Sequence, residues 1–443
     1  MSGSRRWVWV CVLAGALSLP VAGAAGAVGA GRDPGRAGET IGPDFRVSGK
    51  SGTGGETSAA VAANATAGGF LVVWMDGRDP DQGLRVFGRR VAADGSVVGR
   101  DFAISGHAPA DHTFGVPRGV DVAYSPSADA YLVVWNDLRR YDTRGVDLYG
   151  RMVSGDGVPL GRAFRISGPG ATYPVHESEP AVAYNPNTDE FLVVWQDGRG
   201  KENVYGRRVS ADGAVVGPEI AVGVATDHYE TMPAVAYAST TNEFLVVFED
   251  DRNYSSRLWD IYGQRVSAQG ALVGSGFRIS QYAGLSREVE PSVAFDPSTN
   301  QFLVVWTDGR NWTPRYWDIY GRWVWAPSGT PLASDFRISD DGEEGAGFGT
   351  AVGWSPVTER LLVVWRDARE NLTRASDIYG RRVAPGGAPL GGAFRISGLA
   401  AVEMEGDPDL AWDEATDGFL MVRSDYRDEA ERGSDIYGRL VTG

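Results

Sequence analysis

The sequence predicts an all-β protein, a seven-bladed β-propeller with four antiparallel strands in each blade. An apolar run, FLVVW or a close variant, recurs seven times at intervals of 53 to 61 residues. Each run is followed by an aspartate and, two residues later, by an arginine. The last repeat lacks a fourth strand, and a spare copy of that strand precedes the first repeat. The seven runs begin at Phe70, Tyr131, Phe191, Phe244, Phe302, Leu361 and Phe419.

Four short segments with strand character follow one another in each repeat, and the third repeat shows them best. They span 181–184, 191–196, 204–209 and 220–222 and are separated by turn-forming pairs. The second segment is apolar at consecutive positions, which indicates a strand that is covered on both faces, as expected inside a packed blade. We therefore place the seven blades at 56–105, 116–167, 176–223, 229–280, 288–339, 347–397 and 405–443.

The two ends of the chain favour a closed ring. The seventh repeat stops at Gly443, directly after its third strand at 435–441. Residues 44–48, DFRVS, match the FRIS segment of other repeats, so we expect them to complete the last blade and remove an open sheet edge. This arrangement resembles the closure of WD40-type propellers, although the Trp-Asp signature of that family is absent. The repeat also resembles those of secreted bacterial propeller proteins, and this resemblance implies a fold rather than an activity.

Residues 1–30 have the features of a signal peptide. The basic pair Arg5-Arg6, which is compatible with twin-arginine export, precedes an apolar run at 7–19 that is too short to span a bilayer. The only cysteine, Cys11, lies in this segment, so we expect no disulfide or thiol chemistry in the mature chain. We expect a secreted, single-domain protein of residues 31–443 without a membrane span.

The formal net charge of the chain is −15 at pH 7. A surface this acidic repels nucleic-acid phosphates and anionic membranes, so we exclude both as partners. The expected partner is a glycan or an extracellular protein, and we expect the propeller to be a monomer.

The Asp-x-Arg pair after the apolar run occurs in all seven blades, which favours a structural role. In five blades this arginine lies eight residues before the aspartate of a D-I/L-Y-G segment, and we expect the two to form an arginine–carboxylate clamp. The alternative is seven equivalent ligand sites, as in multivalent lectin propellers. Arg85 and Asn203 replace that aspartate in the first and third blades, which argues against seven equal sites.

A glutamate recurs in the connection that leads into the first strand of a blade. The second and sixth blades carry Pro117 and Gly347 there instead. Five carboxylates would then surround one mouth of the axial channel. They form either a solvated acidic rim or a site for a cation or a polyhydroxylated ligand, in which mutual repulsion could raise a pKa and create a general acid. The five are Glu56, Glu177, Glu230, Glu288 and Glu405.

All four histidines fall in the same connections. His176 directly precedes Glu177, and His228 lies two residues before Glu230. These four side chains could hold a divalent metal ion or transfer protons, although no HExxH-type spacing is present. The alternative is that they are loop histidines engaged in hydrogen bonds, and apart from this cation no cofactor is expected. The other two histidines are His107 and His112.

Aromatic residues gather in two of the loops between the second and third strands. Tyr254 lies in the fourth blade, and Trp312 and Tyr316 lie in the fifth. Aromatic side chains in neighbouring loops are suited to stacking on sugar rings or to capturing a partner. Trp259 and Trp317 belong to the same loops, but they could instead pack between blades.

These features predict a secreted binding protein that recognises a glycan or an extracellular protein through one loop face. The alternative is a carbohydrate-active enzyme, a glycoside hydrolase or a polysaccharide lyase, with its site at the axial mouth. A third possibility is a scaffold that only spaces other components. The sequence has no Gly-x-Ser-x-Gly elbow, phosphate-binding loop, EF-hand loop or sialidase Asp box. The acid and base groups of the enzyme would come from Glu177, Glu230, Glu288 and Glu405 with His176 or His228.

Overall fold

The computed structural model describes residues 40–49, 54–79, 83–106, 119–168, 175–223, 227–312, 316–340, 347–369, 375–398, 405–406, 408–428 and 433–443. The predicted signal peptide and the predicted site positions His107, His112 and Pro117 lie outside these residues. The described part is almost entirely β-structure, with two single-turn helices, α1 (Tyr141–Arg144) and α2 (Tyr254–Arg257). None of its helices is long and apolar enough to cross a membrane.

The strands form seven antiparallel four-stranded units, each ordered from the centre outward. The first three are β2 (Glu56–Ala63), β3 (Phe70–Asp76), β4 (Arg85–Val91), β5 (Val97–Ala103); β6 (Val120–Ser125), β7 (Ala130–Asp137), β8 (Gly145–Ser154), β9 (Phe164–Arg165); and β10 (Val175–Asn185), β11 (Glu190–Asp197), β12 (Asn203–Ser210), β13 (Val215–Ala221). The next two are β14 (Glu230–Ala238), β15 (Glu243–Asp250), β16 (Leu258–Ser267), β17 (Leu272–Arg278); and β18 (Ser286–Asp296), β19 (Gln301–Asp308), β20 (Asp318–Trp325), β21 (Thr330–Arg337). The last two are β22 (Gly347–Ser355), β23 (Arg360–Asp367), β24 (Asp377–Val383), β25 (Pro389–Arg395); and β26 (Asp409–Asp413), β27 (Gly418–Asp425), β28 (Asp435–Thr442), β1 (Thr40–Arg46).

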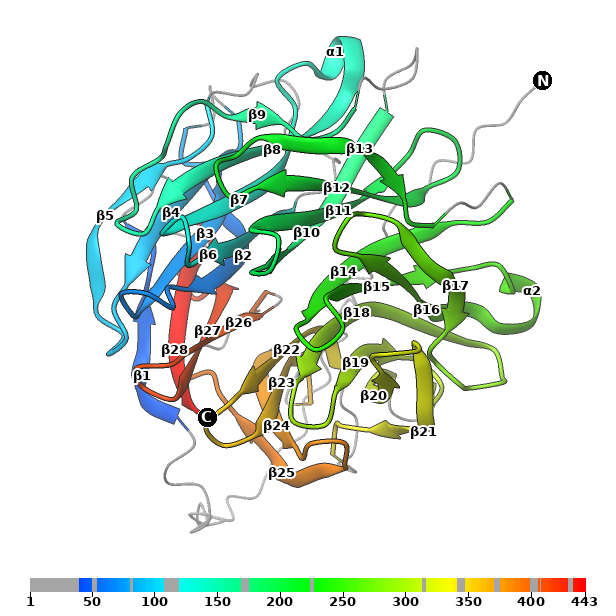
Figure 1. Ribbon diagram of the computed structural model, residues 1–443. Helices are drawn as coiled ribbons and strands as arrows, with labels where there is room; N and C mark the ends of the chain where they lie inside the picture. Colours follow the sequence, from blue (N-terminus) through cyan, green and yellow to red (C-terminus); the bar gives the residue numbers. More distant parts are fainter. Residues whose placement is uncertain are drawn as a thin grey trace, which may run out of the picture. The chain divides into compact units, whose positions relative to one another are not determined.

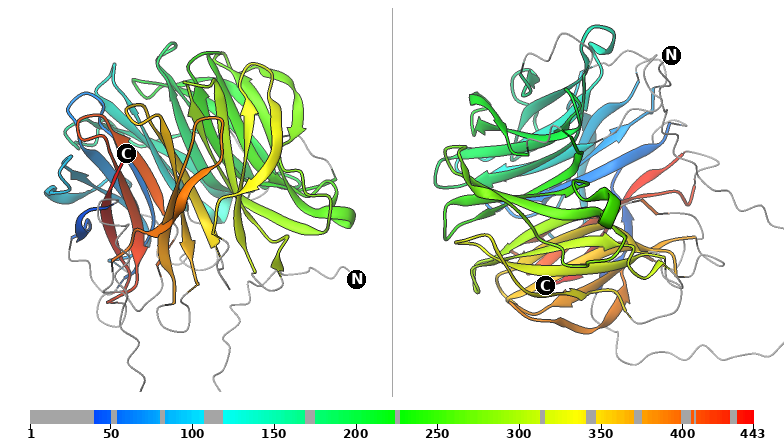
Figure 2. Two further views of the ribbon diagram at one scale, coloured as in Figure 1. Left: turned by 90° about the horizontal axis from the view of Figure 1, so that it is seen from below. Right: turned by 90° about the vertical axis from the view of Figure 1, so that its right-hand side faces the viewer.

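The seven units stand around a common axis (Figure 1, Figure 2). The innermost strand of each blade contacts that of the next blade, and β26 of the last blade contacts β2 of the first. The ring is therefore closed, as the sequence predicts. Short parallel pairings of β8 with β10 and of β16 with β18 join two pairs of neighbouring blades further.

The core lies between the blades rather than within one sheet. Alternate residues of the second strand face opposite neighbours: Leu71 and Val73 cluster with Val133 of the second blade, whereas Val72 clusters with Leu420 of the seventh. This two-sided packing explains why the second strand is apolar at consecutive positions. The tryptophans that end this strand are fully buried at Trp74, Trp135, Trp195, Trp306 and Trp365.

The N-terminal strand completes the last blade. β1 pairs antiparallel with β28, with Thr40 opposite Val441 and Phe45 opposite Gly438. Val47 and Ser48 continue the pairing, because both backbone N–H groups donate to the carbonyl of Ile436. The predicted closure is therefore confirmed, and the strand begins earlier than residue 44.

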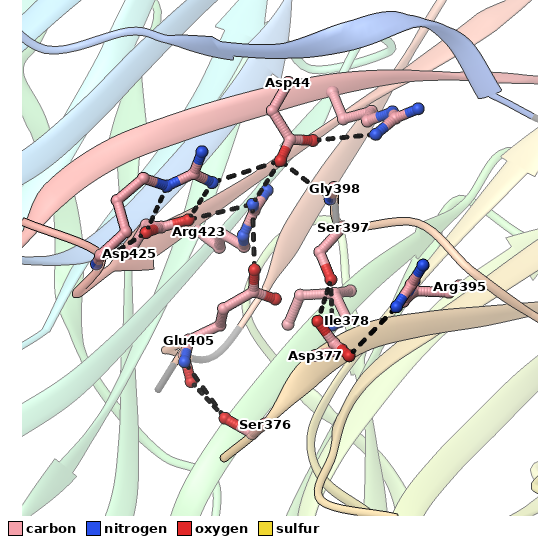
Figure 3. A network of polar contacts seen from close by, with 12 residues as sticks. Asp44, Ser376, Asp377, Ile378, Arg395, Ser397, Gly398, Glu405, Arg423 and Asp425 are labelled. Atoms are coloured by element: carbon pink, nitrogen blue, oxygen red, sulfur yellow. Dashed lines mark hydrogen bonds and ion pairs between the residues drawn. The ribbon is translucent and has the colours of Figure 1, made fainter. Parts of the chain in front are cut away.

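A buried polar network fixes this junction (Figure 3). Arg423 takes the place of the tryptophan in the seventh blade and is completely buried. Its Nη2 lies 3.0 Å from Asp44 of the N-terminal strand and 3.1 Å from both Glu405 and Asp425. Because a buried charge is tolerated only when it is paired, the arginine depends on both ends of the chain being in place.

Candidate functional site

The constant Asp-x-Arg pair is built into the blade. In the fifth blade Asp308 accepts hydrogen bonds from Trp306 Nε1 at 2.9 Å and from Arg310 Nη2 at 2.6 Å, and the guanidinium lies 3.9 Å from the ring centroid of Tyr320. The same arginine–aromatic contact, at 3.9 to 4.2 Å, occurs in every blade. The pairs are Arg78–Phe87, Arg139–Tyr149, Arg199–Tyr205, Arg252–Tyr262, Arg310–Tyr320, Arg369–Tyr379 and Arg427–Tyr437. A contact repeated seven times holds the fold.

The predicted clamp between the arginine of Asp-x-Arg and the aspartate of D-I/L-Y-G is wrong. The aspartate of D-I/L-Y-G forms its ion pair with the arginine of the FRIS segment instead, as Asp260 does with Arg278 at 2.6 Å. The reason is the register of the third and fourth strands, which brings the FRIS arginine beside the start of the third strand. The other pairs of this kind are Asp147–Arg165, Asp318–Arg337, Asp377–Arg395 and Asp435–Arg46.

The five recurring glutamates do not form a solvated rim, because all five are buried. Each lies opposite the aspartate of its own Asp-x-Arg pair, and the side chains of Glu56, Glu177 and Glu230 reach the third strand of the preceding blade. Glu177 Oε2, for example, accepts the N–H of Leu148 at 2.7 Å, and Glu56 Oε2 accepts that of Ile436 at 3.2 Å. Burial and nearby aspartates raise the pKa of Glu177 to about 8 and that of Glu288 to about 9.

The structure does not bring His176, Glu177, His228 and Glu230 into one cluster. The exposed ring of His176 packs edge-on against Tyr141 of the second blade, with centroids 5.6 Å apart. Over the described ranges, the one group of metal-ligating side chains whose ligand atoms all lie within 4.8 Å of one another is His228, Glu230 and Asp250. Of the four side chains proposed from the sequence, this group contains His228 and Glu230, and Asp250 was not predicted because the Asp-x-Arg pair is common to all blades.

His228 stands over two buried carboxylates at the junction of the third and fourth blades. Its Nε2 lies 3.7 Å from Glu230 Oε1 and 3.5 Å from Asp250 Oδ2, and its Nδ1 lies 2.8 Å from Asp227 Oδ1. Arg252 Nη2 lies 2.5 Å from Asp250 Oδ2 and 3.6 Å from Glu230 Oε1. Burial, reinforced by the charge of Asp250, raises the pKa of Glu230 to about 7.

The third repeat departs from the others where it meets Glu230. In other blades the serine of FRIS accepts the N–H of the third strand, as Ser280 does from Ile261 at 3.0 Å. Gly223 replaces this serine in the third blade, and a side chain there would overlap Glu230 Oε2. The carboxylate of Glu230 therefore occupies the space of the missing serine. Aligning the repeats at their fourth strands would have revealed this departure from sequence alone.

A second irregular feature lies on the same face, in the fifth blade. Trp312 is 54% exposed and Tyr316 is 51% exposed, and their rings meet edge-on with centroids 5.4 Å apart. Trp312 also rests edge-on against Trp317, which packs against Phe348 of the sixth blade. We call these four residues the aromatic platform. Trp317 therefore packs between blades, which was the alternative to a role in binding, and Tyr254 is exposed on the neighbouring loop.

Tyr316 has a backbone conformation that favours glycine. Its φ is 66°, in the left-handed region. Tyr316 lies two residues before Asp318, the first conserved residue of the third strand. Glycines with positive φ occupy the same position in the first, second and seventh blades: Gly83, Gly145 and Gly433. A bulky aromatic residue in this conformation is strained.

Two aspartates on the innermost strands were not among the predicted site residues. Asp121 Oδ2 accepts the N–H of Val182 in the next blade at 2.7 Å, and Asp409 Oδ2 accepts that of Val61 at 2.8 Å. Each therefore links two innermost strands. Burial raises the pKa of Asp121 to about 8, and the charge of Asp409 adds to this. The equivalent positions of other blades are Ala60, Ala181, Ala234, Ser292 and Ala351, so a comparison of repeats would have shown both aspartates as exceptions.

No family model and no curated protein matches the chain. Solved structures match it at low identity. A polysaccharide lyase, Uly1, is 9% identical, covers 87% of this chain and 90% of its own, and has a TM-score of 0.54. A protein of unknown function from Dyadobacter fermentans is 11% identical over 91% of this chain and 99% of its own, with a TM-score of 0.53. An α-L-arabinanase from Penicillium chrysogenum, complexed with arabinobiose, is 10% identical over 90% of this chain and 98% of its own, with a TM-score of 0.50. At such identities these likenesses show the β-propeller fold alone.

Proposed function

We propose that this protein is a secreted carbohydrate-binding propeller that holds a polysaccharide against the aromatic platform. The observation that carries this proposal is the pair of rings, Trp312 and Tyr316, each more than half exposed and braced by a second layer of aromatic side chains. Sugar rings present apolar C–H faces, and a rigid aromatic surface stacks on them with little loss of side-chain entropy.

The strain at Tyr316 supports the same function. The backbone position requires a left-handed conformation, for which glycine carries no penalty and other residues cost roughly 1 kcal/mol or more. Three blades have glycine there, and Leu258 and Ala375 adopt a positive φ at the same position of the fourth and sixth blades. A tyrosine that is both strained and exposed contributes little to the fold, so its contribution is expected in binding.

Polysaccharide hydrolysis or elimination is the second candidate function. Two of the solved structures with this fold are named as an arabinanase and a polysaccharide lyase, which favours an active enzyme over a pure binding protein. The glutamates predicted as acid and base do not favour it, because all four are buried in the blades and do not meet a polymer at the surface: Glu177, Glu230, Glu288 and Glu405.

Affinity electrophoresis in gels containing arabinan, xylan, galactan, pectin or alginate tests the proposal. We expect at least one polymer to retard the wild-type protein. Trp312→Ala should weaken retention at least tenfold in dissociation constant, which corresponds to about 1.4 kcal/mol. Trp325→Ala is the matched control, because Trp325 is 36% exposed but lies at the opposite end of β20 from the loop face.

Two outcomes would contradict polysaccharide binding at the platform: no retardation in any of the polymers, or equal losses in the two tryptophan variants. The same polymers, incubated with the protein and assayed for new reducing ends and unsaturated products, separate the two candidate functions. Product release that Trp312→Ala diminishes would establish the enzyme. Binding without product would establish the binding protein.

A further inference from the structure

The geometry points to a binding site for one divalent transition-metal ion, Zn²⁺ in the first place, formed by His228 Nε2, Glu230 and Asp250 at the junction of the third and fourth blades. This site shares no residue with the aromatic platform, and it does not depend on polysaccharide binding.

The separations of the three groups fit an ion placed between them. In a tetrahedral zinc site with bonds of about 2.0–2.2 Å, neighbouring ligand atoms lie about 3.3–3.6 Å apart. His228 Nε2 lies 3.5 Å from Asp250 Oδ2 and 3.7 Å from Glu230 Oε1. Both distances exceed those of a good hydrogen bond, yet they are close to what a shared ion requires. One nitrogen and two oxygens would leave a fourth position for water.

Hydrogen bonding prepares the imidazole as a ligand. Asp227 lies 2.8 Å from Nδ1, and because a carboxylate only accepts, Nδ1 carries the hydrogen. In the neutral ring the lone pair is then on Nε2, which faces the two carboxylates. A carboxylate that holds the distal nitrogen of a histidine is the usual support of a metal-bound imidazole.

An independent observation is the unpartnered nitrogen that His228 turns toward the two carboxylates. Nε2 is buried and, within the described part of the chain, forms no hydrogen bond. The side chain of Glu230 is only 2% exposed and faces this nitrogen with Oε1, while the same carboxylate also accepts the backbone N–H of Val204. A buried nitrogen without a partner is unfavourable, and an ion bound to it would remove this penalty.

The departures of the third repeat make the site specific to this junction. Gly223 leaves space into which the Glu230 carboxylate moves, whereas at the junction of the fourth and fifth blades Ser280 of the fourth blade remains beside Glu288, and Ser286 occupies the position of His228. Arg252 is the competing cation, because its Nη2 already bonds Asp250 Oδ2. The second oxygen, Oδ1, also accepts from Arg252, so Asp250 can turn Oδ2 toward a metal without losing the arginine.

The test uses the secreted chain purified without a histidine tag, treated with a chelator and titrated with ZnCl₂. We expect one Zn²⁺ per chain by calorimetry and by metal analysis after gel filtration, together with a higher melting temperature. His228→Ala should lower the affinity at least tenfold and remove the thermal shift. His176→Ala is the matched control and should bind Zn²⁺ as the wild type does, since His176 packs on Tyr141.

Three results would overturn the metal site: no stoichiometric uptake by the wild type, unchanged affinity in His228→Ala, or an equal loss in His176→Ala. Circular dichroism and the melting temperature without metal establish that His228→Ala is folded. Failure here would leave the polysaccharide proposal standing, because Trp312→Ala and Trp325→Ala test that proposal at other residues.

Discussion

Arg423 Nη2 lies 3.0 Å from Asp44 Oδ2 and joins residues that are 379 positions apart in the chain. In five blades a tryptophan at the position of Arg423 donates its Nε1–H to the aspartate two residues later. Arg423 keeps this contact through Asp425 and adds the link to Asp44 (Figure 3). The arginine replaces the tryptophan in the seventh blade, which is formed by both the N-terminal strand and the C-terminal repeat. The ion pair therefore stabilises the closure of the ring.

This relationship predicts a large effect of Asp44→Ala on stability. Removing one partner of a buried ion pair typically costs about 3–5 kcal/mol, because the remaining charge is left without full compensation. We expect the free energy of unfolding in urea to fall by about 3 kcal/mol or more. Asp101→Ala is the matched control, since Asp101 lies on the fourth strand of the first blade, is less buried than Asp44 and pairs with Arg78. Equal losses of unfolding free energy in both variants would show that Asp44 stabilises the protein no more than an ordinary ion-pairing aspartate within one blade.

The raised pKa of Glu288 predicts how stability changes with pH. Burial, reinforced by the charge of Asp308, raises this pKa from an ordinary value of 4.5 to about 9. Because the folded state holds the proton more tightly, the stabilising contribution is complete below pH 4.5 and is lost as the pH rises toward 9. Glu288→Gln resembles the neutral form and has no such loss. Melting temperatures should therefore agree at pH 5, and the variant should melt higher at pH 9. A variant that melts lower at pH 9 would contradict the pKa shift.

The left-handed conformation of Tyr316 predicts that one substitution there changes stability and polysaccharide binding in different directions. Tyr316→Gly should leave the free energy of unfolding unchanged or raise it by up to about 1 kcal/mol, since glycine relieves the strain. The same variant should bind the polysaccharide more weakly. Ala375→Gly is the control, because Ala375 has a φ of 57° at the same position of the sixth blade. It should share the effect on stability and leave binding unchanged. Chemical denaturation and affinity electrophoresis measure the two properties.

Much of the fold follows from the sequence because the repeat carries its own physical constraints. An apolar run such as Phe70–Trp74 can be satisfied only by neighbours on both faces, and Leu71 and Val72 indeed pack against different blades. Residues 44–48 resemble the strand that the seventh repeat lacks. Both signals are local, and the ring follows from repeating them.

The candidate site follows from the sequence only in part, because burial depends on contacts between blades. Glu177 reads as an exposed loop acid, yet it is buried and its carboxylate accepts the N–H of Leu148 in the preceding blade. Nothing local to Glu177 contains that information. Asp250 was missed for a related reason: a residue shared by all blades can acquire a different role in one of them, here because His228 and Gly223 change its surroundings.

We propose that function lies where the blades depart from their repeat, on the loop face of the fourth and fifth blades. The most direct test is the dissociation constant of the retained polysaccharide for the wild type, Trp312→Ala and Trp325→Ala, measured side by side. We expect the affinity to fall at least tenfold in Trp312→Ala and to stay unchanged in Trp325→Ala. Equal binding by all three proteins would contradict it.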